Sequence, residues 1–344
     1  MEYVQFGRTG LRVSRLCLGS DSFGHPHGCD EKEARRIIAR AYESGIFFLD
    51  TAQVYADGRS EEIIGRYMRD SGVRDQIVIG TKFRSRMGSG PNDATGSRQH
   101  IMRAVEGSLR RLQTDRIDVY YMHHFDPTTP LEETLRALDD LVKQGKILYA
   151  GCSNFAAWAV VKSLWISDVR NLVRFDCAQS IYNIVQPWLK VDLLPVALDE
   201  GMAVVTYSPL GAGLLTGKHP RSAPLGEGMF GARDRERGGP LAKLYLDDHK
   251  YDTVDRLSTV ADKHGVPAMH LSLKWVAETP GITSVIFGAR TEEQLAGVLD
   301  AWSGNVSQEA INEVIQVANE FSSTARMSYP PPPPPSQRDP DHYR

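Results

Sequence analysis

The ranges IVIGTK (77–82), SRQHIMRAVEGSLRRL (97–112) and IDVYYMHH (117–124) decide the fold class. The first and third are short apolar runs, typical of buried strands. Between them, apolar side chains such as Ile101 and Val105 recur at helical spacing, which predicts an amphipathic helix. Strands that are apolar along their whole length indicate a parallel sheet covered by helices. The three ranges therefore predict one strand–helix–strand unit of such a sheet.

The same alternation continues along the chain, with about eight strand–helix units after a hairpin expected over residues 3–13. The other strands are expected at RLCLG (15–19), FFLDT (47–51), ILYAGCSN (147–154), FDCAQ (175–179), MAVVTYS (202–208) and SVIFG (284–288). Such a run closes into a barrel or lies open as a doubly wound sheet. Polar residues follow nearly every strand, which favours a barrel, because an open sheet concentrates them at one switch point. We predict an α/β protein: a (β/α)8 TIM barrel with an N-terminal β-hairpin and long loops at the C-terminal face.

Helices are expected over residues 31–45, over 60–72 with Ser60 as N-cap, and over 189–200. The long loops are expected over 84–96, rich in Gly, Ser and Pro, and over 219–248, which is charged and rich in Gly.

From residue 322 onward the chain loses all periodicity, so we predict a single domain over 1–321 and a Pro-rich, flexible C-terminal tail over 322–344. The run Pro330–Pro335 should adopt polyproline II. We favour a solvated or loosely packed tail over a ligand for an SH3-type domain.

The composition is that of an ordinary globular protein: 344 residues, 41% apolar, 24% charged, with a formal net charge of -3. That charge gives no electrostatic case for nucleic acid or an anionic membrane as a partner. The start of the chain lacks the features of a signal peptide, and no apolar run approaches the ~20 residues that span a bilayer. We therefore expect a cytoplasmic protein whose partner is a small molecule, and the sequence leaves its oligomeric state open.

Metal binding is not expected. The four cysteines form no CxxC pair, and the cluster of His25, His27 and Cys29 lacks a fourth ligand at suitable spacing. We interpret this cluster as part of a loop near the mouth of the barrel.

Four chemically complementary residues lie at or just past the ends of three predicted strands: Asp50, Tyr55, Lys82 and His123. Reduction of a carbonyl needs a proton donor, and a free tyrosine with a pKa of ~10 is a weak acid at neutral pH. A nearby ammonium such as Lys82 favours the phenolate, and Asp50 would hold that ammonium charged. His123 would orient the carbonyl oxygen by a hydrogen bond. Each residue alone also fits a structural role, but together they favour carbonyl reduction.

Longer matches identify a family. The motifs that carry the resemblance are GIFFLDTAQVYADGRSEEIIG (45–65), TKF (81–83), DVYYMHH (118–124) and GKILYAGCSNF (145–155). With them, the chain resembles the aldo-keto reductase superfamily from FGRTGLRVSRLCLG (6–19) to GARTEEQL (288–295). The resemblance implies a TIM barrel, NADPH-dependent reduction of an aldehyde or ketone, and the four residues above as the catalytic tetrad.

The resemblance also implies where NADPH or NADP+ binds. The matching positions are Ser20, Asp50, Ser153, Asn154, Gln179, Tyr207, Ser208, Pro209, Leu210, Gly211, Lys218, Gly288, Arg290 and Gln294. Among them Asn154 and Gln179 match contacts to the nicotinamide end, Tyr207 the stacking aromatic, and Arg290 a contact at the adenosine-phosphate end. Gly297 and Val298 stand where relatives carry a Glu-Asn pair on the adenine, which leaves the preference between NADPH and NADH open.

The substrate side is expected to contain Phe23, Tyr55, His123 and His124. A second imidazole at His124 suggests a polar, sugar-like or nucleotide-sugar keto substrate, although a packed surface histidine is an equal alternative. The main hypothesis is an NADP-dependent oxidoreductase. The alternative is an NADP(H)-binding regulatory or redox-sensing subunit resembling potassium-channel β subunits, and the intact tetrad argues against it.

Overall fold

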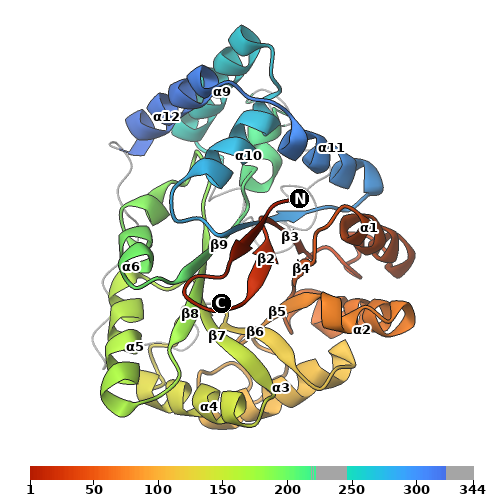
Figure 1. Cartoon of the computed structure of the whole chain (residues 1–344), viewed down its shortest axis with the longest axis vertical. Helices are drawn as coiled ribbons and strands as arrows, with labels where there is room; N and C mark the ends of the chain where they lie inside the picture. Colours follow the sequence, from red (N-terminus) through yellow and green to blue (C-terminus); the bar gives the residue numbers. More distant parts are fainter. Residues whose placement is uncertain (218, 220, 222–245, 323–344) are drawn as a thin grey trace.

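In the computed structural model, which describes residues 1–217, 219, 221 and 246–322, parallel strands close into a barrel in the order β10-β3-β4-β5-β6-β7-β8-β9 (Figure 1). These strands are β3 (Leu16–Gly19), β4 (Phe48–Asp50), β5 (Val78–Phe83), β6 (Ile117–Met122), β7 (Ile147–Ser153), β8 (Phe175–Ile181), β9 (Ala203–Tyr207) and β10 (Ser284–Gly288). Each of the eight strand positions expected from the sequence is occupied, so the predicted (β/α)8 barrel is confirmed.

Helices surround the barrel on its outside (Figure 1). They are α1 (Glu31–Glu43), α2 (Arg59–Ser71), α3 (Arg98–Leu112), α4 (Leu131–Lys143), α5 (Ala157–Arg170), α6 (Leu193–Asp199), α9 (Asp248–His264), α10 (Ala268–Glu278), α11 (Glu292–Ser303) and α12 (Gln308–Ser322). Short 3-10 turns are η1 (Tyr55–Gly58), η2 (Arg74–Gln76), η3 (Trp188–Lys190) and η4 (Gly211–Thr216).

Two helix predictions are wrong in detail. The helix expected over 189–200 begins only at Leu193, because Pro195 lacks an N–H and is tolerated in a first turn but not in a helix interior. Ser60 is not the N-cap of α2, since Gly58, with φ of 92°, takes that position. The buried Ser60 hydroxyl instead donates to the carbonyl of Ser20 at 2.8 Å, which ties α2 to the end of β3.

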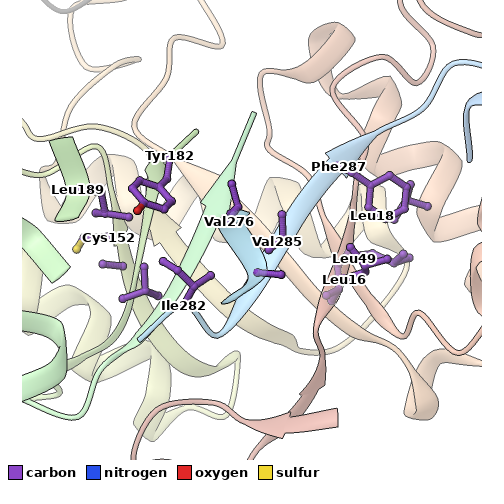
Figure 2. Packing of buried hydrophobic residues seen from close by; sticks show 14 of the residues in the cluster. Leu16, Leu18, Leu49, Cys152, Tyr182, Leu189, Val276, Ile282, Val285 and Phe287 are labelled. Atoms are coloured by element: carbon purple, nitrogen blue, oxygen red, sulfur yellow. The ribbon is translucent and has the colours of Figure 1, made fainter. Parts of the chain in front are cut away.

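The alternation of side chains along the strands separates two hydrophobic cores. In β6, Val119 and Tyr121 face the interior of the barrel, whereas Tyr120 and Met122 pack outward against the helices. Figure 2 shows part of the outer core, to which β3, β4, β10 and α10 contribute. Period-2 alternation therefore also fixes which side chains can reach the interior of the barrel near its ends.

The N-terminal hairpin closes one end of the barrel. It consists of β1 (Tyr3–Gln5) and β2 (Arg12–Ser14), which pair antiparallel. Phe6, in its turn, is fully buried and meets the ring of Phe48 edge-on with 6.0 Å between centroids. Gly7 has φ of 58°, and a Cβ there would lie 2.5 Å from the backbone nitrogen of Ala203, so the turn requires glycine. The hairpin is thus a plug at the N-terminal ends of the strands.

Residues 84–96 form the expected loop between β5 and α3. Most of the loop expected over 219–248, and the tail after Ser322, lie outside the described residues, so the division into 1–321 and 322–344 stays a prediction. Within the described part of the chain, no helix is long and apolar enough to cross a membrane.

Candidate active site

The strand ends place the four tetrad residues together. Asp50 is the last residue of β4 and is paired in register with Gly80 of β5, so Lys82 lies two residues further along the same inward-facing side. His123 directly follows β6, and its backbone N–H donates to the carbonyl of Phe83 at 3.1 Å. The tetrad therefore occupies the C-terminal end of the barrel, as expected from the sequence.

Lys82 is the centre of the tetrad. Its side chain is fully buried, and its ammonium donates to the carboxylate of Asp50, to the carbonyl of Thr51 at 2.7 Å and to the hydroxyl of Tyr55 at 3.4 Å. These contacts use all three N–H groups of an ammonium. The second carboxylate oxygen of Asp50 accepts from the amide of Gln179 at 2.8 Å. The orientation of Lys82 is thus determined on every side.

The charges of the buried pair depend on each other. Burial raises the pKa of Asp50, opposed by the charge and hydrogen bonds of Lys82 and Gln179. Burial by itself lowers the pKa of Lys82, but the charges of Asp50 and Tyr55 outweigh it, so the net direction is upward. The site therefore keeps Lys82 as an ammonium at neutral pH.

Tyr55 lies in η1, just after β4, and two residues in the left-handed region follow it, Ala56 with φ of 48° and Asp57 with φ of 56°. The Lys82 ammonium is 5.0 Å from the centroid of the Tyr55 ring. Burial raises the pKa of Tyr55, while the charge of Lys82 acts in the opposite direction. Lys82 therefore favours the phenolate, as expected, but in this structure the effect of burial is larger.

Two histidines form one wall of the site. The rings of His123 and His124 stack with 4.6 Å between centroids, and Nδ1 of His123 lies 3.1 Å from the Ser85 hydroxyl. Burial, followed by the charges of His124, Lys82 and Arg84, holds the pKa of His123 well below its usual value. Burial together with Arg84 and Lys82 lowers the pKa of His124 to about 4. Both imidazoles are therefore neutral at pH 7.

The ends of β7, β8 and β9 carry the residues matched to the nicotinamide end of a cofactor. Asn154, just after β7, is in the left-handed region with φ of 58° and donates through its side chain to the carbonyl of His123 and to the hydroxyl of Ser153. The hydroxyl of Tyr207 donates to the side-chain oxygen of Asn154 at 2.8 Å. These contacts join the expected cofactor residues directly to the tetrad.

The amide of Gln179 shows whether a nicotinamide fits there. It is 3% exposed and donates to Asp50, but its side-chain oxygen accepts no hydrogen bond from any residue that the structure describes. An amide oxygen without a protein donor can accept a hydrogen bond from the amide N–H of a ligand. The site therefore fits the carboxamide of a nicotinamide.

The segment after β9 turns sharply. Ser208, Gly211 and Ala212 have φ of 55°, 56° and 55°, and the side chain of Asn183 donates to the carbonyl of Ser208 at 2.9 Å. Pro209 and Leu210 lie within this turn, whereas Lys218 lies outside the described residues.

The predicted adenosine-phosphate residues lie at the start of α11. Gly288 ends β10 and is exposed, the backbone N–H of Arg290 donates to the side chain of Gln294 at 2.8 Å, and the Arg290 guanidinium donates to the carbonyl of His27. Val298, on α11, is buried in the outer core and offers no surface to an adenine.

Two further expected residues have mainly structural surroundings. Ser20 is buried and donates to the carbonyl of Asp50 at 2.9 Å. Phe23 is fully buried in the outer core, so its side chain is not exposed to a substrate in this structure. Its expected contact with a substrate stays a prediction. Around His25 and Cys29, as in the rest of the described chain, no three His, Cys, Asp or Glu side chains could hold a metal ion.

The sequence reasoning missed two contributors to the tetrad, the carbonyl of Thr51 and the hydroxyl of Ser85. Every residue has a backbone carbonyl, so the amino-acid sequence does not indicate that the carbonyl of Thr51 contributes to the site. Ser85 lies in a loop whose path the sequence pattern does not define, and its only signal is its position three residues after Lys82.

Comparison with known proteins agrees with this geometry. The model of the aldo/keto reductase family matches residues 15–319. The uncharacterized oxidoreductase YrpG of Bacillus subtilis is 38% identical over 90% of this chain and 94% of its own. A protein of Oryza sativa named as a probable voltage-gated potassium channel subunit beta is 37% identical, over 86% of this chain and 89% of its own.

A third relative, the L-glyceraldehyde 3-phosphate reductase of Escherichia coli, is 32% identical over 86% of each chain. The family match spans nearly the whole chain, and oxidoreductases are among its relatives. The chain therefore belongs to the aldo/keto reductase family and is an oxidoreductase acting on carbonyl groups.

Proposed function

We propose that this protein uses NADPH to reduce an aldehyde or ketone to an alcohol, with Tyr55 as the general acid. The observation that carries the proposal is the fully buried ammonium of Lys82, which contacts both the carboxylate of Asp50 and the hydroxyl of Tyr55. A buried ammonium directed at a phenol stabilises the phenolate that remains after proton transfer.

In this mechanism the carbonyl oxygen of the substrate lies between Tyr55 and His123. Because the Tyr55 oxygen accepts from Lys82, its own O–H is left to donate to the substrate. If the Ser85 hydroxyl donates to Nδ1 of His123, the neutral imidazole presents an Nε2–H donor, which would orient the same oxygen. As the carbonyl carbon gains a hydride, its oxygen takes the proton of Tyr55, and Lys82 stabilises the tyrosinate until solvent reprotonates it.

The cofactor supplies the hydride when bound. Gln179 and Asn154 would hold the carboxamide of the nicotinamide, Tyr207 would stack on its ring, and Arg290 would bind a 2′-phosphate. The predicted contacts from Ser20, Ser153, residues 208–211, Lys218, Gly288 and Gln294 are part of the same proposal. Arg290 supports NADPH over NADH, because a planar guanidinium suits a phosphate.

The substrate proposed is a small polar carbonyl compound. The stacked, neutral pair of His123 and His124 offers hydrogen-bonding groups beside the reacting carbon, which suits a hydroxylated, sugar-like aldehyde or ketone. A relative named for a phosphorylated three-carbon aldehyde agrees with this class.

A second candidate function is a cofactor-binding regulatory subunit. Its support is the likeness to proteins named as probable potassium channel β subunits, at 37% identity. Negligible turnover on a broad panel of carbonyl compounds, together with a stable co-purifying protein, would favour this alternative over the reductase.

The central experiment replaces Tyr55 by Phe, which keeps the ring and removes the acidic hydroxyl. We expect hydride transfer to fall by ~100-fold or more, with NADPH binding nearly unchanged, because general acid catalysis contributes about 10²–10⁴ in rate. The rate is measured from the loss of NADPH absorbance in single turnovers. Tyr149→Phe, near the hairpin at the opposite end of the barrel, is the matched control. Turnover of Tyr55→Phe equal to that of the control would contradict the proposal.

A further inference from the structure

The outer face of α5 is unusually apolar. Trp158, Val161, Trp165 and Val169 are exposed to 43%, 47%, 62% and 60%, and their spacing of three or four residues places them in one row along the helix. We call these four residues the α5 stripe. The opposite face of α5, including Val160 and Leu164, is buried against the barrel. Lys162, Asp168 and Arg170 are also exposed on α5, so the α5 stripe is an apolar row bordered by charged side chains.

The neighbouring helix shows the ordinary pattern. The exposed residues of α4 are Glu133, Arg136 and Lys143, while its leucines face the core. Two exposed tryptophans two turns apart on one helix, with valines between and beyond them, are an apolar area of the kind that marks an interaction surface. We therefore expect another segment or molecule to cover the α5 stripe.

The described chain ends close to one end of this stripe. The Lys190 side chain in η3 donates to Asn319 in the last turn of α12 at 3.4 Å. Two residues further on, the Asp192 carboxylate accepts from the backbone N–H of Ala157, the first residue of α5, at 3.1 Å. Figure 1 shows α5, α6 and α12 on the same side of the barrel. The chain beyond Ser322 thus starts near the end of α5 that carries Trp158.

We propose that the Pro-rich segment of this same chain, Pro330–Pro335, docks on the α5 stripe. Polyproline segments bind to grooves lined by aromatic side chains, because they are already extended and lose little entropy on binding. Tryptophan is well suited to this contact, since it offers a large flat apolar surface at low entropic cost.

The dimensions agree. Trp158 and Trp165 are seven residues apart, or ~10 Å at 1.5 Å per helical residue, and one turn of polyproline II covers ~9 Å. Prolines three apart could therefore meet both rings. The six prolines span ~19 Å, against ~16 Å from Trp158 to Val169. The seven residues 323–329 reach up to ~24 Å beyond the end of α12.

The test uses a fluorescent reporter in the full-length chain. All four native cysteines are buried, so Ser336→Cys, just after the prolines, can be labelled selectively with a bimane probe that tryptophan quenches on contact. We expect severalfold quenching that does not change with protein concentration. The quenching should be relieved by Trp158→Phe with Trp165→Phe, and also when Gly and Ser replace Pro330–Pro335. Trp302→Phe, on α11, should have no effect.

Each other outcome overturns the proposal. Equal emission in all variants would show that the segment does not reach the α5 stripe. Quenching that grows with protein concentration, together with a doubled mass in light scattering, would show that a second copy covers the stripe. Quenching that persists after the proline run is replaced would show that the prolines are not recognised.

Discussion

The two ends of the barrel are built from the same strands but in opposite ways. At the N-terminal end, Phe6 fills the interior among apolar neighbours such as Phe48 and Val119. At the C-terminal end, the same interior positions carry the buried charges of Asp50 and Lys82. Burying charge is costly unless it is paired and hydrogen-bonded, whereas burying a phenyl ring is favourable. The N-terminal end of the barrel therefore stabilises the fold. This stabilisation offsets the cost of burying the charged groups at the C-terminal end.

Left-handed backbone occurs at both ends of the barrel. Non-glycine residues in the left-handed region include Arg84, Asn154 and Ser208, each just after a strand at the C-terminal end. At the N-terminal end, this region is occupied by glycines such as Gly7 and Gly201, and also by Gln113 and Asn171, the C-caps of α3 and α5. Left-handed backbone costs an ordinary residue roughly 1–2 kcal/mol, and such strain persists where the surrounding structure enforces it, often at functional sites.

The largest effect on stability should come from the N-terminal end. We expect Phe6→Ala to lower the free energy of unfolding by ~3–5 kcal/mol, because it removes a fully buried ring and leaves a cavity. The kcat of the folded fraction should not change. Denaturant unfolding and single-turnover kinetics measure the two quantities separately. Phe6→Leu is the control and should cost less than ~1.5 kcal/mol. A matching fall in kcat would show that the two ends are not independent.

An acid-dependent loss of stability should arise at the C-terminal end. The pKa of His124 falls from 6.5 in a free histidine to about 4 in the folded protein, so the unfolded state binds more protons in this window. The contribution of His124 is complete above about pH 6.5 and is lost as the pH falls toward 4. Its upper limit is ~3 kcal/mol, at 1.36 kcal/mol per pKa unit.

The measurement is denaturant unfolding between pH 7 and pH 4. We expect His124→Gln to flatten the pH dependence relative to the unsubstituted protein, since glutamine does not titrate. The His123 contribution has the same sign and remains in this variant. If the free energy of unfolding of His124→Gln depends on pH as strongly as that of the unsubstituted protein, His124 does not contribute to the acid sensitivity.

What could be predicted from the sequence follows the same division. The strands and the tetrad were predictable because period-2 alternation and strand ends place Asp50 and Lys82 on one inward-facing side. The hairpin was predictable from its turn. The burial of Phe6 inside the barrel was not predictable, because it depends on the diameter of the closed sheet.

The hydrogen bonds of Ser60 and Ser85 could not be predicted from the sequence. Ser60 looked like a helix cap in the sequence, yet its hydroxyl bonds to Ser20 and Thr51 at the ends of two strands. Ser85 reaches His123 because the ends of β5 and β6 are paired, which places the residues that follow them close together. Short polar side chains satisfy whichever partner the tertiary structure brings near, so local sequence does not define their role.

The smallest effect is expected at the start of α11, which follows the C-terminal end of β10. Arg290→Ala should weaken NADPH binding about tenfold, or ~1.4 kcal/mol, while NADH binding changes little. The nearby start of α11 is already occupied by a carboxylate, since Glu33 accepts from the backbone N–H of Glu292 at 3.1 Å. A 2′-phosphate would therefore depend on the Arg290 guanidinium more than on the helix dipole. Fluorescence titration with each cofactor measures the difference, and Arg40→Ala, on an exposed part of α1, is the control. Equal losses of affinity for NADPH and NADH would show that Arg290 does not bind the 2′-phosphate and does not select between the two cofactors.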